Sequence, residues 1–144
     1  MTRLINSAGL ALIKEYEGYV GHAYLDTGGV PTIGYGHTRG VQMGKKCTPE
    51  QAEVWLEADL ESAERDVQKL VRVPLTDNQY AALVSFTFNL GGERLRKSTL
   101  LKLLNAADYA GAGGQFQFWV FDNGKKLPGL IKRRNAEATL WGMK

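Results

Sequence analysis

The chain has 144 residues, of which 44% are hydrophobic and 23% charged. This composition is typical of one globular domain and excludes disordered and collagen-like chains. The single cysteine, Cys47, and only two histidines argue against an intramolecular disulfide and a metal site, and we expect no cofactor. The first long apolar run, Leu10 to Ile13, is far below the roughly 18 to 20 residues of a membrane span. We therefore expect a soluble protein made in the cytoplasm.

The net charge of +3 is unevenly distributed along the chain. Residues 1–70 contain 7 Lys or Arg and 10 Asp or Glu, whereas residues 71–144 contain 11 and 5. A basic half favours an anionic partner. This partner could be a nucleic acid, an anionic membrane or a cell-wall polymer, and the charge alone does not distinguish these three. No nucleic-acid recognition motif is present, so we do not expect a nucleic-acid partner.

The first half of the chain predicts a helix, a hairpin and a long helix. Helical spacing over residues 9–16 follows Ser7, a good N-cap, and ends before Gly18, so Glu17 lies at the helix C-terminus. Residues 23–37 are glycine-rich and indicate a β-hairpin or small meander. Thr48 then begins a capping signature, and hydrophobic periodicity predicts one amphipathic helix to about residue 72.

The second half of the chain predicts a cluster of helices. Thr76 repeats the capping signature, further helices are expected near Ser98 and Asp108, and a last one spans about Pro128 to Trp141. Three glycines should shorten the helix after Asp108 or make it mobile; they are Gly111, Gly113 and Gly114. The predicted fold is α+β: one mostly helical domain of residues 1–144, in which a long helix joins a small N-terminal β-lobe to a helical lobe, with a cleft between the lobes.

Three residues before and within the predicted hairpin carry candidate chemistry: Glu17, Asp26 and Thr32. Hydrolysis of an acetal needs one carboxyl that donates a proton and a second that stays ionised. The dipole at a helix C-terminus disfavours an ionised Glu17, which suits an acid. Asp26, opening a turn with free backbone N–H groups, should stay ionised, and Thr32 should share a water with it across the hairpin.

Longer motifs around these residues resemble those of the phage-type lysozymes, glycoside hydrolase family 24, which includes the T-even phage lysozyme. The resemblance is carried by Glu17-Gly18, Ala23 to Thr27 and Pro31 to Thr38, and continues through Phe88 to Gly91 and Pro128 to Arg134. It implies an endolysin, an N-acetylmuramidase that cleaves the β-1,4 bond between N-acetylmuramic acid and N-acetylglucosamine in peptidoglycan.

The resemblance also implies a role for each catalytic residue. Glu17 corresponds to the general acid, while Asp26 and Thr32 position water or stabilise the oxocarbenium-like transition state. The family's reaction looks like inversion, which requires the two carboxyl groups to lie roughly 6.5 to 9.5 Å apart. If Arg133 or Arg134 approached Glu17, it would instead favour the ionised carboxyl, so the sequence leaves the charge state of Glu17 open.

Five further residues match supporting positions of the family. Phe88, Thr99 and Trp119 correspond to residues near the wall of the cleft that contacts sugar. His37 corresponds to a histidine beside the site, and Asp59 to its carboxylate partner, so we expect a supporting ion pair rather than a catalytic role.

The expected partners follow from the same resemblance. Many family members carry an N-terminal signal-anchor segment, but here the first predicted helix begins almost at Met1. We therefore expect the protein to depend on a separate holin for export from the host cytoplasm and to act on peptidoglycan in the periplasm. We also expect a monomer, as for a small lysin of this kind. Lys132, Arg133 and Arg134 suggest a possible basic surface for anionic outer-membrane contact, although a solvated helix face explains them as well.

Several alternatives remain at this point. A Glu before Gly is often only an exposed helix end, and Asp-Thr-Gly-Gly is often only a turn, but three functional residue types at two matching spacings favour the hydrolase. A non-catalytic protein could instead disrupt envelopes through the basic C-terminal helix. A lytic transglycosylase would use Glu17 without a water-orienting Asp and would form anhydro-muramic products.

Overall fold

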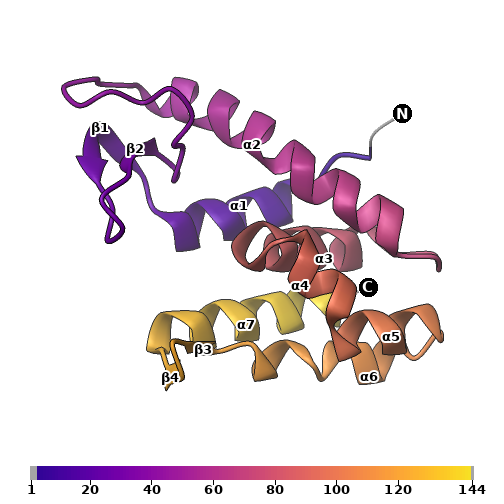
Figure 1. The fold of residues 1–144 in the computed structure, drawn as a ribbon. Coiled ribbons are helices and arrows are strands. Elements are labelled where there is room, and N and C mark those ends of the chain that lie inside the picture. Colours follow the sequence, from indigo (N-terminus) through magenta and orange to yellow (C-terminus); the bar gives the residue numbers. More distant parts are fainter. Residues whose placement is uncertain (1–2, 144) are drawn as a thin grey trace. The chain divides into compact units, whose positions relative to one another are not determined.

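The computed structural model describes residues 3–143, which form a mostly helical chain with two small antiparallel sheets (Figure 1). This architecture confirms the predicted α+β class. The chain divides into two compact units. The hairpin unit is Ile13–Glu61, and the helical unit contains the residues up to Leu12 and those from Ser62 onward.

The hairpin unit contains the predicted β-hairpin. Strand β1 (Val20–Leu25) pairs antiparallel with β2 (Pro31–Gly34), and the register places Tyr24 opposite Thr32 and Leu25 opposite Pro31. The following loop returns to β1, because the backbone N–H of Ala23 donates to the carbonyl of Lys45 at 2.8 Å. Helix α1 (Ser7–Glu17) enters this unit and ends at Glu17, as the sequence predicts.

Helix α2 (Pro49–Leu70) begins where the capping signature indicates. The Thr48 hydroxyl accepts from the backbone N–H of Gln51, and the Gln51 side chain accepts from the backbone N–H of Thr48. This reciprocal pair satisfies two N–H groups that a helix start would leave without partners. Its periodic hydrophobic residues are buried, as expected for an amphipathic helix; they are Leu56, Leu60, Ala63 and Val67.

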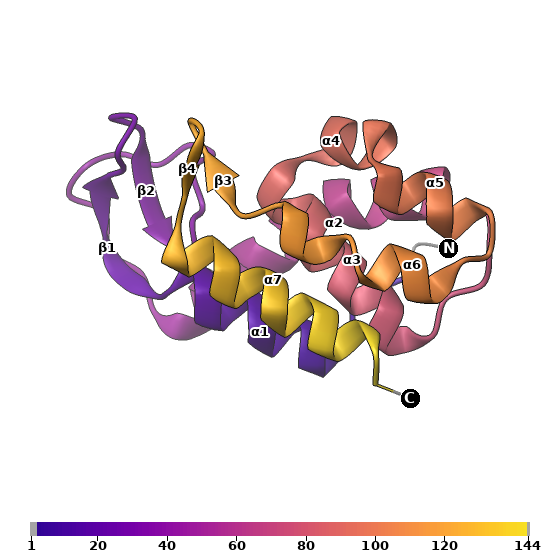
Figure 2. The ribbon, with the colours of Figure 1, turned by 90° about the horizontal axis from the view of Figure 1, so that it is seen from below.

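The helical unit is built around α3 (Asp77–Leu90), whose residues from Tyr80 to Thr87 are buried. Thr76 caps it with the predicted box. The unit also contains part of α2 and four later helices: α4 (Gly92–Lys97), α5 (Thr99–Asn105), α6 (Tyr109–Gly113) and α7 (Pro128–Trp141). Figure 2 shows α7 from below, and it packs against α3.

The later helices confirm the predicted starts. Ser98 accepts from the backbone N–H of Leu101 at 3.0 Å, and Asp108 accepts from that of Gly111 at 2.8 Å. Helix α6 has five residues, which agrees with the shortening expected from its glycines. Helix α4 and the 3-10 turn η1 (Phe116–Phe118) were not predicted.

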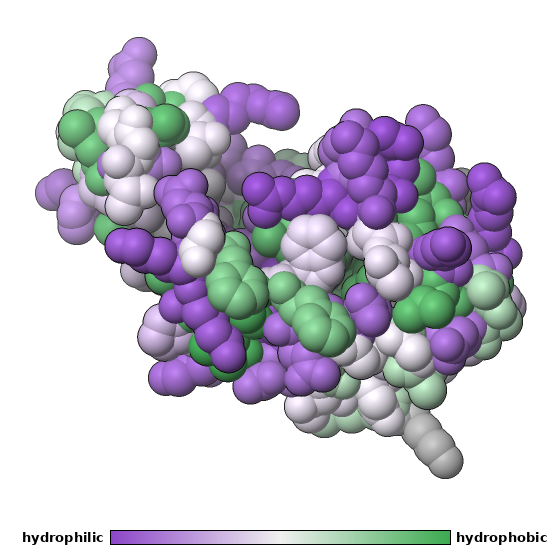
Figure 3. All heavy atoms as spheres, turned by 60° about the horizontal axis from the view of Figure 1, so that its bottom comes forward, coloured by the Kyte–Doolittle hydropathy of each residue, from purple (hydrophilic) through white to green (hydrophobic). Residues whose placement is uncertain are grey.

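A second hairpin was also not predicted. Strand β3 (Phe121–Asp122) pairs with β4 (Lys125–Lys126), and the connecting Asn123 and Gly124 have φ values of 51° and 77°. Two left-handed residues, the second a glycine, are typical of the tightest hairpin turns. Figure 3 shows hydrophobic side chains exposed among hydrophilic ones, and Phe121 is one of the exposed hydrophobic residues.

The expected basic surface on α7 is wrong for two of its three residues. Arg133 and Arg134 are only 4% and 0% exposed, while Lys132 is exposed. The cause is Glu137, which lies on the same helix face, is itself 0% exposed, and places Oε1 2.7 Å from Nε of Arg134. The Ser85 hydroxyl donates to the same carboxylate at 2.6 Å. These guanidinium groups therefore lie inside the helical unit and do not face an anionic membrane.

Burial opposes charge within this cluster. It lowers the pKa of the Arg134 guanidinium and raises the pKa of the Glu137 carboxyl, while the attraction between the two groups acts in the opposite direction on both. Such a pair contributes little over apolar packing, but removal of one member leaves a buried charge without compensation.

Replacement of Glu137 by Ala should therefore lower the free energy of unfolding by about 3–5 kcal/mol, because it leaves two buried guanidinium groups without their carboxylate. Urea denaturation followed by circular dichroism measures the change. Glu93→Ala is the control, because it breaks the ion pair with Arg96 at the protein surface and should cost much less. Equal losses for the two variants would contradict the structural role of Glu137.

Candidate active site

Glu17 lies at the last position of α1 and is half-buried. Its carboxyl oxygen Oε1 lies 3.0 Å from the point that a Cβ would occupy at Gly36, where φ is +77°. Only glycine adopts this backbone conformation without strain, and only glycine leaves this space for the carboxyl group. The backbone at Gly36 therefore forms one wall of the position that Glu17 occupies.

Asp26 opens the turn between β1 and β2. Its Oδ1 accepts from the backbone N–H groups of Gly28 and Val30, both at 2.8 Å. These two hydrogen bonds hold the Asp26 carboxyl group in one orientation. The turn is closed by the N–H of Gly29, which donates to the Asp26 carbonyl at 2.9 Å.

Thr32 is tied to the same turn through Val30. Its hydroxyl donates to the Val30 carbonyl at 2.9 Å, and the backbone N–H of Asp26 donates to that same carbonyl at 3.0 Å. One carbonyl thus sets the position of both predicted residues. Val30 has no signal in the sequence for this role, because it acts through its backbone carbonyl and no side-chain pattern marks such a role.

The hairpin register places Asp26 and Thr32 on one face. Thr32 lies opposite Tyr24, and two residues further along the strand Asp26 faces Val30, so Asp26 and Thr32 are diagonal neighbours. Since the Thr32 hydroxyl donates to Val30, its oxygen remains an acceptor, like the carboxylate. Two acceptors on one face match the two hydrogens of a water molecule and leave its lone pair free for attack.

His37 and Asp59 are brought together as expected. Nδ1 of His37 lies 2.8 Å from Oδ2 of Asp59, which projects from α2. The backbone of His37 also exchanges two hydrogen bonds with Ile33, both at 2.9 Å. Asp59 therefore holds the residue that closes the turn after Thr32.

The three predicted sugar-contacting residues lie in the helical unit. Phe88 is half-buried on α3, and Thr99 is exposed at the first position of α5. Trp119 is half-buried and packs edge-on against Phe86, with ring centroids 5.6 Å apart. Sugar contact by these residues stays a prediction.

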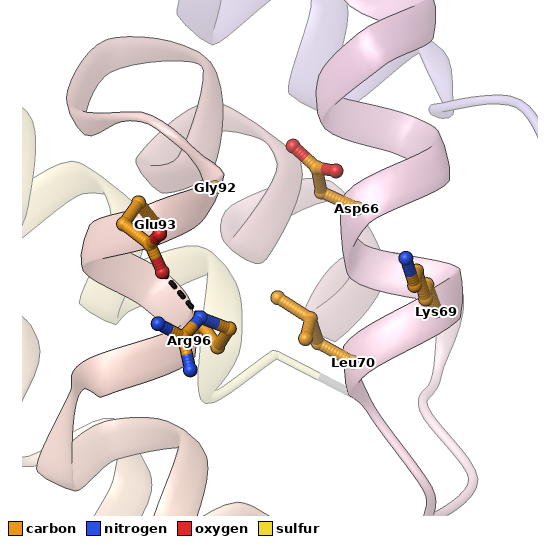
Figure 4. Close-up of a pocket in the computed structure, with 6 residues that line it drawn as sticks. All are labelled: Asp66, Lys69, Leu70, Gly92, Glu93 and Arg96. Atoms are coloured by element: carbon orange, nitrogen blue, oxygen red, sulfur yellow. Dashed lines mark hydrogen bonds and ion pairs between the residues drawn. The ribbon is translucent and has the colours of Figure 1, made fainter.

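A separate pocket of about 260 Å³ lies between α2 and α4 in the helical unit (Figure 4). Two acidic and two basic side chains line it together with Leu70 and Gly92, and Glu93 and Arg96 pair with each other along α4. None of the predicted site residues lines it. Within residues 3–143, no group of three or more His, Cys, Asp or Glu could hold a metal ion.

Gly36→Ala should impair the peptidoglycan hydrolysis expected from the sequence at least tenfold, because a methyl group would press on the Glu17 carboxyl and a 1 Å misplacement can cost about 100-fold in rate. Gly40→Ala is the matched control, since φ is +69° there and no atom lies within 4 Å of the added Cβ. Both variants should lose similar thermal stability. Equal activity in the two, measured by release of reducing ends, would contradict the close contact with Glu17.

Comparisons with known proteins point to one family. The model of the phage lysozyme family matches residues 14–137. An endolysin of Acyrthosiphon pisum secondary endosymbiont phage 1 is 46% identical over 141 residues, which cover 95% of this chain and 97% of the relative. The endolysin of Salmonella phage P22 is 39% identical, with 95% and 97% covered.

A solved structure agrees over the whole fold. The muramidase domain of SpmX from Asticaccaulis excentricus superposes with a TM-score of 0.92 at 37% identity, covering 99% of this chain and 100% of that domain. No helix in residues 3–143 is long and apolar enough to cross a membrane. The family match, the similar relatives and the shared fold all include the segment with Glu17, Asp26 and Thr32, and the chain belongs to the phage lysozyme family.

Proposed function

We propose that this chain is an endolysin with N-acetylmuramidase activity, which hydrolyses the β-1,4 bond between N-acetylmuramic acid and N-acetylglucosamine in peptidoglycan. The observation that carries the proposal is the joint fixation of Asp26 and Thr32 by the Val30 carbonyl, with the Glu17 carboxyl against Gly36 in the same unit. The motifs around these residues support assignment to glycoside hydrolase family 24.

In the proposed reaction, Glu17 donates a proton to the glycosidic oxygen as the bond to the anomeric carbon breaks. Asp26 and Thr32 hold a water molecule by its two hydrogens, so that its lone pair attacks that carbon. The water proton passes to Asp26, and proton exchange with solvent restores both carboxyl groups. Attack by this water on the face opposite the leaving group gives an inverted product.

Other residues support this reaction in the proposal. Phe88, Thr99 and Trp119 contact the sugar chain. His37 and Asp59 act as a structural pair, since the described contacts of His37 are to Ile33, Asp59 and a neighbouring aromatic ring. No metal or other cofactor takes part in the proposed step.

The proposal extends to the cellular setting that the resemblance implies. The protein acts as a monomer on the cell wall in the periplasm, and a separate holin releases it from the host cytoplasm. Nucleic acid is not a substrate or partner. The envelope-disrupting alternative is not favoured, because its two central cations, Arg133 and Arg134, are buried.

Glu17→Gln should abolish hydrolysis, because an amide cannot donate the proton that the leaving oxygen needs, and loss of a general acid costs about 100- to 10,000-fold. The measurement is clearing of purified peptidoglycan by both proteins at equal concentration, with circular dichroism to confirm equal folding. In host cells that express them, only the wild type should cause lysis, and only when an inner-membrane pore is supplied.

Lys132→Ala is the matched control, because this exposed cation lies on α7 in the helical unit and has no role in the proposed proton transfer. It should clear peptidoglycan like the wild type. Undiminished clearing by Glu17→Gln would overturn the proposed acid, and lysis without a pore would overturn the dependence on a holin.

A further inference from the structure

Trp55 lies on α2 in the hairpin unit and contacts the segment that follows Thr32. Its ring stacks on the His37 ring, with centroids 4.9 Å apart and planes 14° from parallel. Its Cε3 lies 3.7 Å from the Cβ position of Gly34. The segment is therefore held at two points, and Gly36 lies between them.

The same ring lies beside Lys45, whose backbone is hydrogen-bonded to the other strand of the hairpin. Nζ of Lys45 lies 5.2 Å from the centroid of the Trp55 ring, within the range of a cation–π contact. The Lys45 carbonyl accepts from the backbone N–H of Ala23 on β1. Trp55 thus contacts residues attached to both strands, although it belongs to neither.

The turn of residues 33–37 needs contacts from other parts of the chain to stay in one conformation. Ile33 and His37 exchange backbone hydrogen bonds around a turn in which Gly34 and Gly36 have φ values of +69° and +77°. Glycine adopts such values without strain, but it also allows many others, so two glycines in three residues leave the turn flexible by itself. A rigid aromatic ring against both ends restricts it.

The position of this turn controls the proposed catalytic groups. Thr32 directly precedes it, and the backbone of Gly36 within it adjoins the Glu17 carboxyl. A shift of the turn would therefore move the hydroxyl that holds water and change the wall beside the acid. Such a shift would leave the α2 core residues in place, since Leu56 and Leu60 are separately buried.

Trp55 differs from an ordinary core residue. It is half-buried, and a pocket of about 290 Å³ lies beside it, lined by Glu50, Gln51, Val54 and Trp55. Burial of apolar area alone would not require a ring parallel to His37, because any large aliphatic side chain supplies apolar area. The stacking of the Trp55 ring on the His37 ring explains why residue 55 is aromatic.

We propose that Trp55 is a positioning residue for hydrolysis, which fixes the turn of residues 33–37 and through it the placement of Thr32 and of the Glu17 carboxyl. The inference rests on the proposed muramidase function. Trp55 acts on the rate of the chemical step and not on the binding of the sugar chain.

The test compares Trp55→Leu with Trp55→Phe in steady-state hydrolysis of solubilised peptidoglycan strands. Trp55→Leu should lower kcat roughly 10- to 100-fold, because small misplacements of reacting groups have effects of this size, and should leave KM within about twofold. Trp55→Phe retains an aromatic face and should recover kcat to within about threefold of the wild type.

Two controls separate positioning from loss of stability. Leu56→Ala removes a buried side chain of the same helix, and it should lower the melting temperature while kcat stays near the wild-type value well below that temperature. In a His37→Ala background, Trp55→Leu should lower kcat by less than threefold, because the stacking of Trp55 on His37 is already lost and only its contacts with Gly34 and Lys45 remain. If Trp55→Leu does not fold by circular dichroism, Trp55→Met takes its place.

Three outcomes would overturn the inference. They are an unchanged kcat in Trp55→Leu, a raised KM with unchanged kcat, which would make Trp55 a substrate-binding residue, and an equal fall of kcat in Leu56→Ala. Glu17→Gln is measured in parallel. If it retains activity, the muramidase proposal fails, whereas inactive Glu17→Gln beside fully active Trp55→Leu rejects the positioning role alone.

Discussion

The Val30 carbonyl is the acceptor on which the proposed catalytic arrangement depends. It accepts hydrogen bonds from the backbone N–H of Asp26 and from the hydroxyl of Thr32. The same carbonyl therefore fixes the geometry of the turn and the placement of both residues. Preorganised groups of this kind stabilise a transition state without having to reorient during the reaction. Asp26 and Thr32, with the roles proposed for them, therefore depend on a short hairpin whose strands are only six and four residues long, and that hairpin needs support.

The support comes from α2, which lies outside the hairpin. An isolated two-stranded hairpin is at best marginally stable in water. Gly34 lies against Ala52, His37 pairs with Asp59, and Trp55 stacks on His37. Three successive turns of α2 therefore contact the segment that follows Thr32. The helical unit is stabilised differently, by buried apolar side chains and by the cluster of Arg133, Arg134 and Glu137.

Sequence patterns predicted the elements better than the partners of their side chains. The capping boxes at Thr48 and Thr76 involve residues three apart, so they can be read directly, and the structure has both. Burial of Arg134 could not be predicted, because its partners are Asn89 and Glu137, and Glu137 in turn accepts from Ser85. Ser85 and Asn89 are distant in sequence. The spacing of the candidate catalytic residues predicted a hydrolase, whereas the Val30 carbonyl and the Glu17 contact with Gly36 are backbone features without a side-chain signal.

The most direct test of the account is the fate of the attacking water. Peptidoglycan strands are digested in water labelled with oxygen-18, and the first product is examined by mass spectrometry and proton NMR. The account predicts one labelled oxygen at the anomeric carbon of the new muramic acid end, which appears first as the α anomer. An unlabelled anhydro product, or a labelled β anomer, would contradict direct attack by a water held between Asp26 and Thr32.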